Sequence, residues 1–212
     1  MLILVAGANG QIGRQLLRRI KLSLNHSRAM IRDAGQSDTL RTLGADETIV
    51  ADLEGDVRPA MEGCDAVVFT AGSGGQTGPE KTDAVDRDGA IGLIDACKDA
   101  GIQRFVMVSS MGTDDPDNGP EGLRHYLQAK QAADKHLADS GLDYTIVRPG
   151  RLTDDVGSGK VAVSNSLGRS GSVPRADVAA VLMAVLQAPE TAGMTFELLA
   201  GQTPVREAIA AL

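Results

Sequence analysis

The stretch that decides the fold is Met1-Leu2-Ile3-Leu4-Val5-Ala6-Gly7-Ala8-Asn9-Gly10-Gln11-Ile12-Gly13-Arg14-Gln15-Leu16-Leu17. Its apolar run from Leu2 to Val5 predicts a strand that is buried on both faces. The run leads into three glycines spaced Gly-x-x-Gly-x-x-Gly and then into a helix predicted from Gln11 to about Ile20. Glycines permit positive φ and a close ligand, and the first N–H groups of the helix attract an anion. We expect a dinucleotide pyrophosphate here, with an ordinary tight turn as the alternative.

Beyond this turn, apolar strands alternate with helical segments, the pattern of an α/β protein with a parallel sheet. The predicted strands cover 28–31, 47–51, 65–69, 105–108, 144–147, 161–163 and 195–199. The predicted helices cover 11–20, 36–43, 83–100, 123–140, 175–187 and 205–212. We therefore predict a doubly wound, mostly parallel sheet with helices on both faces, in a single domain over 1–212. Residues 151–212 are too few for a second domain, and we expect them to contribute a small cap on the substrate side.

Composition narrows the classes of partner. The chain has 212 residues, 42% of them hydrophobic and 23% charged, with a formal net charge of −7. This charge disfavours nucleic acid or an anionic membrane as a general partner. No apolar run approaches a membrane span, and the chain opens on the first strand, so we expect a cytoplasmic protein, monomeric or homodimeric. Cys64 and Cys97 fit reduced, buried thiols, and neither they nor the histidines have metal-ligand spacing, so we expect no metal.

Arg32 is the residue that bears on the choice of dinucleotide. It follows the second predicted strand, where an acidic side chain would bind the ribose 2′-hydroxyl of NAD and an arginine accommodates the 2′-phosphate of NADP. Arg14, just after the glycines, offers a second cation. We therefore predict NADP. The neighbouring Asp33 keeps NAD possible, and an ordinary polar loop at Arg32 and Asp33 is the alternative.

Two further strand ends carry candidate cofactor contacts. Asp52 follows the third strand at the carboxyl edge of the sheet, where ligands bind in open α/β sheets. We expect its carboxylate either to accept a hydrogen bond from an adenine amino group or to cap a loop. The fourth strand ends in Thr70-Ala71-Gly72-Ser73-Gly74-Gly75. These glycines fit either backbone lying close to the nicotinamide ribose or a flexible loop.

Ser110, Tyr126 and Lys130 are the candidate catalytic residues. Tyr126 and Lys130 are four residues apart on a predicted helix and so share one face, and Ser110 follows the fifth strand. An ammonium beside a phenol lowers the pKa of the phenol from about 10, which suits proton transfer at neutral pH. Ser110 would hold the substrate oxygen while the nicotinamide exchanges hydride. The alternative for Tyr126 and Lys130 is a solvated helix face.

Together these motifs resemble the short-chain dehydrogenase/reductase superfamily, and more closely its atypical branch of NmrA-like, sugar epimerase/dehydratase-like and type B biliverdin reductase proteins. The motifs occur in family order over essentially the whole chain and include Val108-Ser109-Ser110, Tyr126-Leu127-Gln128-Ala129-Lys130 and Val147-Arg148-Pro149-Gly150. The resemblance implies a Rossmann fold with Ser110, Tyr126 and Lys130 at the catalytic positions. The cofactor-binding residues it implies are Gly7, Asn9, Gly10, Gln11, Ile12, Gly13, Arg32, Asp52, Leu53, Ala71, Gly72 and Lys130.

Three functions compete. The first is an NADP-dependent oxidoreductase that reduces a small carbonyl or quinone-like compound. The second is an NADP(H)-sensing regulatory protein without chemistry, since Lys130 also serves cofactor binding in the resembled family. The third is a sugar-nucleotide epimerase or dehydratase, which the short carboxyl-terminal region disfavours. The substrate itself is a small molecule that the sequence does not identify.

Overall fold

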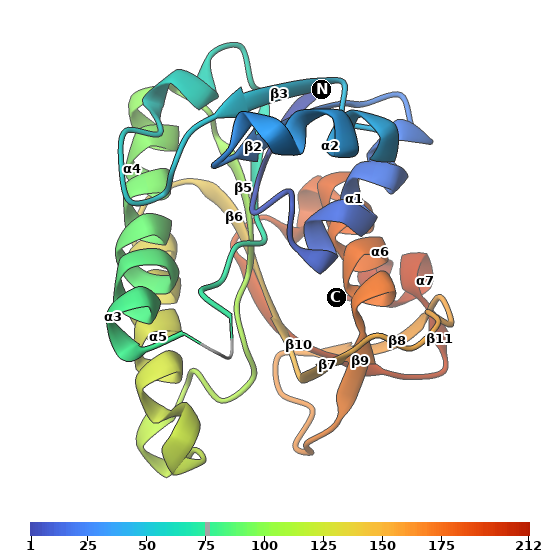
Figure 1. Cartoon of the computed structure of the whole chain (residues 1–212). Helices are drawn as coiled ribbons and strands as arrows, with labels where there is room; N and C mark the ends of the chain where they lie inside the picture. The colour runs from blue at the N-terminus through green and yellow to red at the C-terminus, as the bar shows by residue number, and fades with distance from the viewer. Residues whose placement is uncertain (75–76) are drawn as a thin grey trace.

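A mostly parallel sheet forms the centre of the protein (Figure 1). The computed structural model describes residues 1–74 and 77–212; Gly75 of the predicted loop lies outside them. Within this part of the chain nine strands form the sheet: β1 Leu2–Ala6, β2 His26–Ile31, β3 Glu47–Val50, β4 Ala66–Phe69, β5 Arg104–Val108, β6 Asp143–Pro149, β8 Lys160–Ser164, β10 Met194–Ala200 and β11 Thr203–Pro204. Their order is β11-β8-β10-β6-β5-β4-β1-β2-β3. All neighbours from β3 to β10 pair in parallel, whereas β8 pairs antiparallel with β10 and β11.

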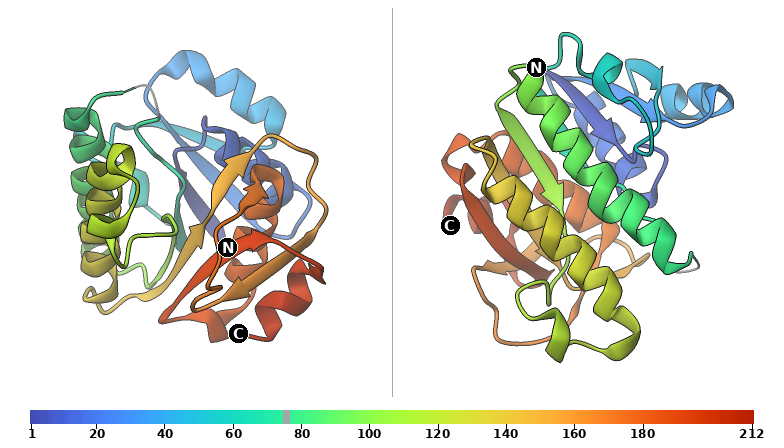
Figure 2. Two further views of the ribbon diagram at one scale, coloured as in Figure 1. Left: turned by 90° about the horizontal axis from the view of Figure 1, so that it is seen from below. Right: turned by 90° about the vertical axis from the view of Figure 1, so that its left-hand side faces the viewer.

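Helices cover both faces of the sheet (Figures 1 and 2). One face carries α1 Gln11–Lys21, α2 Ser37–Leu43, α6 Arg175–Leu186 and α7 Val205–Ala210. The other carries α4 Ala90–Asp99 and α5 Arg124–Ala138, with α3 Pro79–Thr82 and the π-helical segment η3 Asp83–Gly89 leading into α4. Short 3-10 turns lie at η1 Ala34–Gln36, η2 Arg58–Met61, η4 Pro116–Asn118, η5 Glu121–Leu123 and η6 Pro189–Thr191. The predicted doubly wound Rossmann fold is confirmed.

The first strand shows why the apolar run adopts this position. Successive side chains of a strand point to opposite faces of the sheet. Ile3 and Val5 therefore join the core under α1 and α6, while Leu4 and Ala6 join the core under α4 and α5. All four are fully buried, as expected for a strand in the middle of a two-sided sheet.

The helix predicted over 83–100 differs in the structure. Residues 83–89 adopt a π-helical conformation, and the regular α-helix begins only at Ala90. The buried carboxylate of Asp86 lies inside the π-helical segment and accepts the backbone N–H of Ser73 at 3.0 Å. A π turn contains an extra residue, so the apolar spacing on which the prediction rested does not reveal it.

The final sixty residues do more than form a cap. β8, β10 and β11 continue the central sheet, and α6 packs on α1. Outside this sheet, β7 Arg151–Thr153 and β9 Ser172–Pro174 form a parallel pair. No helix in the described part of the chain combines the length and apolarity needed to cross a membrane.

Candidate dinucleotide-binding site

The turn between β1 and α1 requires glycine at two positions. Gly7 has a φ of +81°, and a Cβ there would lie 2.5 Å from the backbone nitrogen of Ala71. A Cβ at Gly13 would lie 2.4 Å from the carbonyl oxygen of Gly7. The backbone N–H of Gly10 donates to that same carbonyl at 2.9 Å and closes the turn. The glycines thus bring the start of α1 tightly against the ends of β1 and β4.

The amino end of α1 is suited to an anion. Its cap residue is Gly10, which has no side chain to occupy the first N–H groups, and the first turn contains no acidic residue. Both features leave the positive end of the helix dipole available to a phosphate. Arg14, the second cation expected from the sequence, donates instead to the side-chain oxygen of Asn9 at 2.6 Å and 3.1 Å. It therefore braces the glycine turn.

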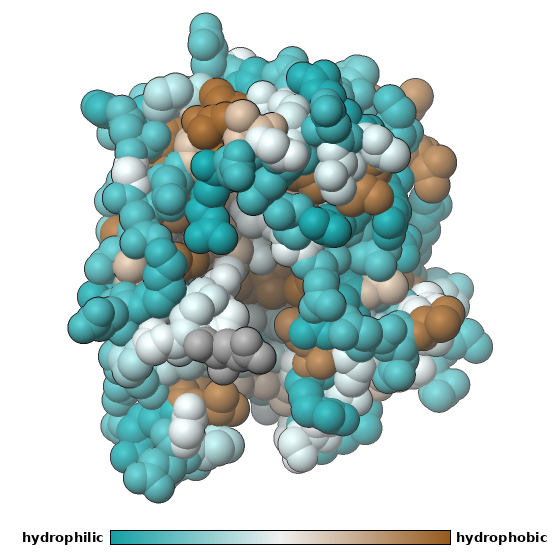
Figure 3. All heavy atoms as spheres, in the orientation of Figure 1, coloured by the Kyte–Doolittle hydropathy of each residue, from teal (hydrophilic) through white to brown (hydrophobic). Residues whose placement is uncertain are grey.

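A cleft of about 300 Å³ opens beside this turn. Figure 3 shows the corresponding hollow in the middle of the face, with apolar residues on its floor. Eight of the predicted cofactor residues line it together: Gly7, Asn9, Gly10, Arg32, Asp52, Leu53, Ala71 and Gly72. Gln11, Ile12, Gly13 and Lys130 are not among the lining residues; Ile12, Gly13 and Lys130 are buried in the packing behind it.

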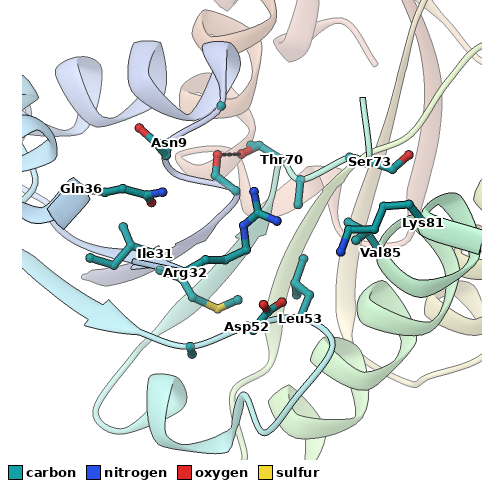
Figure 4. Close-up of a pocket in the computed structure, with 16 residues that line it drawn as sticks. Asn9, Ile31, Arg32, Gln36, Asp52, Leu53, Thr70, Ser73, Lys81 and Val85 are labelled. Carbon is teal, nitrogen blue, oxygen red and sulfur yellow. Dashed lines mark hydrogen bonds between the residues drawn. The ribbon is translucent and has the colours of Figure 1, made fainter. Parts of the chain in front are cut away.

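Arg32 projects into this cleft from the end of β2. Its guanidinium points towards the middle of the cleft (Figure 4) and makes no hydrogen bond or ion pair with any other residue in 1–74 and 77–212. The carboxylate of Asp33 is engaged elsewhere, because it accepts the N–H of Gly35 at 2.8 Å and caps η1. Of these two neighbours, the cation is the one available to a ligand.

Asp52 caps a loop and also lines the cleft. Its carboxylate accepts the backbone N–H of Glu54 at 3.1 Å, which caps the loop after β3. The same side chain lines the cleft below Arg32 (Figure 4).

Several lining residues were not singled out from the sequence. Thr70 donates its hydroxyl to the carbonyl oxygens of Ala6 at 3.0 Å and Gly7 at 3.2 Å, which ties the end of β4 to the glycine turn. The further lining residues are Met30, Ile31, Gln36, Ala51, Ser73, Lys81 and Val85. Lys81 lines the cleft and pairs with Glu54 on the loop after β3. Thr70 and Ser73 could have been identified as lining residues because they follow the end of a predicted strand. Lys81 could not, because it lies on α3, a helix that was not predicted from the sequence.

Tyr126 and Ser110 lie at the carboxyl edge of the sheet, where β5 is adjacent to β4. The Ser110 hydroxyl donates to the carbonyl of Met111 at 3.1 Å. Burial raises the pKa of Tyr126 above its usual value, and the carboxylates of Asp86 and Asp134 raise it further, while Ser110 acts in the opposite direction. The expectation that Lys130 lowers the pKa of Tyr126 is therefore wrong. Desolvation and two nearby negative charges both disfavour the phenolate.

Lys130 is buried behind the cleft, with 1% of its surface exposed. Its ammonium donates to the carbonyl of Val108 at 2.9 Å, lies 4.0 Å from Asp86 and stands 5.2 Å from the centre of the Phe69 ring. Burial lowers the pKa of Lys130, and the carboxylates of Asp86 and Asp134 oppose that shift. The predicted solvated helix face is thus excluded for Lys130.

Two acidic and two basic side chains form a charged group around Lys130, which we call the Lys130 quartet: the buried Asp86, Lys130 and Asp134, and the partly buried Arg148. Arg148 donates from Nε to Asp134 at 2.9 Å. Burial raises the pKa of Asp134, and Arg148 and Lys130 lower it in part. The formal charges of the quartet sum to zero, which is the arrangement that buried charges require.

His125, the neighbour of Tyr126 in the sequence, lies outside this arrangement. His125 is half-exposed and pairs with Asp83 at 3.0 Å, on the neighbouring π-helical segment. In the described part of the chain no group of three or more His, Cys, Asp or Glu side chains is placed to hold a metal ion.

Comparison with known proteins gives a consistent result. A model of the NAD(P)H-binding family matches residues 7–189. The uncharacterized sugar epimerase YhfK of Bacillus subtilis (strain 168) is 45% identical over 213 residues, which cover 99% of each chain. Sanguinarine reductase of Eschscholzia californica is 30% identical over 92% of this chain and 88% of its own. Among solved structures, a candidate NAD-dependent epimerase/dehydratase of Bacillus halodurans has a TM-score of 0.98 and 46% identity, with both chains covered completely.

Proposed function

Because the chain belongs to the NAD(P)H-binding family, we propose that it is an NADP-dependent oxidoreductase that reduces a small carbonyl or quinone-like compound. The observation that carries the proposal is the guanidinium of Arg32, which projects into the cleft and is unpaired among the described residues, combined with the phenol of Tyr126 at the same edge of the sheet. The first feature selects the cofactor and the second supplies a proton.

The residues of the cleft fit a dinucleotide. The first N–H groups of α1 would bind the pyrophosphate, Arg32 the 2′-phosphate, and Asp52 the adenine amino group. Ala71 and Gly72 line the cleft just after β4, and the nicotinamide ribose would lie against them. The bound cofactor would supply a hydride to the substrate.

The state of Tyr126 favours reduction over oxidation. A phenol, whose ordinary pKa is near 10, is protonated at neutral pH, so Tyr126 donates a hydrogen bond to a carbonyl oxygen and passes its proton on as negative charge develops there. Oxidation of an alcohol would instead need the phenolate, which burial, Asp86 and Asp134 all disfavour. Ser110 would hold the same substrate oxygen. The name of the reductase relative agrees with this direction.

The experiment is NADPH oxidation, with NADH in parallel, across aldehydes, ketones, quinones and flavins, with the native protein compared with Tyr126→Phe. We expect turnover of one acceptor class with NADPH, and a loss of about 100-fold or more in Tyr126→Phe, the usual contribution of a positioned acid. Cofactor affinity should be retained. If both proteins bind NADPH and neither oxidises it, the chain is better described as an NADP(H) sensor.

The sugar epimerase reading keeps one specific support, the names of two similar proteins. It requires a tightly held dinucleotide that takes hydride from a sugar and returns it. Purified protein that retains NAD and exchanges hydride internally, without net NADPH consumption, would replace the reductase proposal with this one.

A further inference from the structure

Asp86 connects the cofactor cleft to the proposed catalytic side chains. It lies in η3 with 1% of its surface exposed. One carboxylate oxygen, Oδ2, accepts the backbone N–H of Ser73 at 3.0 Å, and Ser73 lines the cleft. The other oxygen, Oδ1, lies 4.0 Å from the ammonium of Lys130. A single buried side chain therefore touches both parts of the site.

The cofactor loop after β4 is fitted closely to Asp86. A Cβ added at Gly72 would lie 3.3 Å from Oδ1, so glycine at this position brings the loop against the carboxylate. The Ser73 hydroxyl also lies 3.2 Å from that of Thr82 on α3. Movement of Ser73 on cofactor binding would consequently act on Asp86.

The packing of η3 against α5 places Asp86 next to the helix that carries the proposed catalytic side chains. η3 packs against α5, the helix of Tyr126 and Lys130, and Figure 2 shows the helix formed by α3, η3 and α4 beside α5. Among described residues Oδ1 of Asp86 has no hydrogen-bond partner, so Lys130 is its nearest countercharge. A buried carboxylate in this state is costly unless its charge is compensated.

We propose that Asp86 is a positioning residue that couples the cofactor cleft to Tyr126 and Lys130, through Ser73 on one side and the Lys130 ammonium on the other. The contact with Ser73 shapes the cofactor loop. The negative charge holds Lys130 in place and keeps Tyr126 a neutral proton donor. The proposal rests on the proposed function in treating Tyr126 and Lys130 as the reactive pair.

The chain offers a direct optical readout of Tyr126. It contains two tyrosines and no tryptophan, so Tyr144→Phe leaves Tyr126 as the single source of tyrosinate absorbance. The charges that act on Tyr126 are the carboxylates of Asp86 on η3 and Asp134 on its own helix. Lys130 on the same helix lies 4.0 Å from Asp86, and Arg148 on β6 pairs with Asp134. Removal of one negative charge should therefore make the phenol ionise at lower pH.

Two substitutions in the Tyr144→Phe protein separate the two contacts. Asp86→Asn keeps an oxygen for the Ser73 N–H but removes the charge. We expect the tyrosinate absorbance of the folded protein, checked by circular dichroism at each pH, to rise at lower pH than in the parent, with the dissociation constant for NADPH changed less than about threefold. Asp86→Glu keeps the charge but displaces the oxygen. We expect the titration to stay near its original pH and NADPH to bind about tenfold more weakly.

Asp88→Asn is the matched control, because Asp88 lies on the same π-helical segment, is exposed and pairs with Arg87. It should change neither readout. Thermal unfolding identifies any variant that fails to fold. If one of the two Asp86 variants fails, the other still tests its own contact: Asp86→Asn tests the charge, and Asp86→Glu tests the hydrogen bond to Ser73. An unchanged titration in folded Asp86→Asn, or unchanged NADPH affinity in folded Asp86→Glu, would overturn the proposal. Neither readout depends on turnover, so failure of the reductase function remains distinguishable from failure of this inference.

Discussion

A single side chain, Arg32, bears on which dinucleotide the protein prefers. Arginine recognises phosphate through charge-assisted hydrogen bonds, each worth about 1.5–3 kcal/mol. We therefore expect Arg32→Ala to weaken NADPH binding by about tenfold to 100-fold and to leave NADH binding nearly unchanged. Titration of each nucleotide by fluorescence measures both constants.

The control for this substitution is Arg206→Ala on α7, an exposed arginine at the opposite end of the sheet. It removes the same charge from the molecule but not from the cleft, and it should bind NADPH like the parent. Equal weakening of NADPH and NADH by Arg32→Ala would contradict a specific contact with the 2′-phosphate. NAD would then become the better candidate cofactor.

Residue type and spacing predicted the candidate site in part. Arg32, Asp52, Ala71 and Gly72 follow strand ends, and parallel strands bring such positions to one edge, where the structure places them. The raised pKa of Tyr126 was not predictable, because it depends on burial and on the nearby carboxylates of Asp86 and Asp134, whose position around Tyr126 is known only from the fold. Asp86 itself resembles a solvated carboxylate on a helix when only the sequence is available.

The β1–α1 element depends on close backbone contact at Gly13. A methyl group there would lie 2.4 Å from the Gly7 carbonyl and 2.8 Å from Cα of Ala8, and backbone atoms of a closed turn cannot easily move. We expect Gly13→Ala to lower the free energy of unfolding by about 1–3 kcal/mol, the usual range for overpacking, and to weaken NADPH binding. Denaturant unfolding and NADPH titration are the measurements.

At Gly92 in α4, in contrast to Gly13, an added methyl group has open space around it. It is exposed in the helix interior, and a Cβ there would meet no atom within 4 Å. Gly92→Ala should therefore raise stability by about 0.5–1 kcal/mol through helix propensity and leave NADPH binding unchanged. A similar loss of stability in both variants would show that the contact at Gly13 is not the cause.

Elements with a strong apolar period were the ones that the sequence predicted well. The strand predicted over 105–108 matches β5 at Arg104–Val108, and the helix predicted over 123–140 matches α5 at Arg124–Ala138. The π-helical segment η3 was missed because its hydrogen bonding adds a residue to the turn without changing which residue types occur. Strand pairing of β8 and β10 was also not predictable, since it depends on contacts between distant segments.

The molecule as a whole has two hydrophobic cores that share one sheet. Leu16 on α1 belongs to the core on one face, and Leu93 on α4 belongs to the core on the other; both are fully buried. The alternating side chains of β1 enter both cores, so neither core can form without the strands that support the other. The single domain over 1–212 expected from the sequence therefore predicts one cooperative unfolding transition.

Leu16→Ala and Leu93→Ala test this cooperativity. Each should lower the free energy of unfolding by about 2–5 kcal/mol, the usual cost of a cavity at a buried leucine. Tyr144 packs against the core that contains Leu93, so tyrosine fluorescence reports on that face while circular dichroism reports on the whole sheet. If the two faces unfold together, Leu16→Ala shifts the fluorescence transition as far as the dichroism transition.

Leu24→Ala, at a leucine that is 98% exposed, is the control and should shift neither transition by more than about 0.5 kcal/mol. A fluorescence transition that is unmoved in Leu16→Ala would show that the face carrying α4 and α5 unfolds independently of the other.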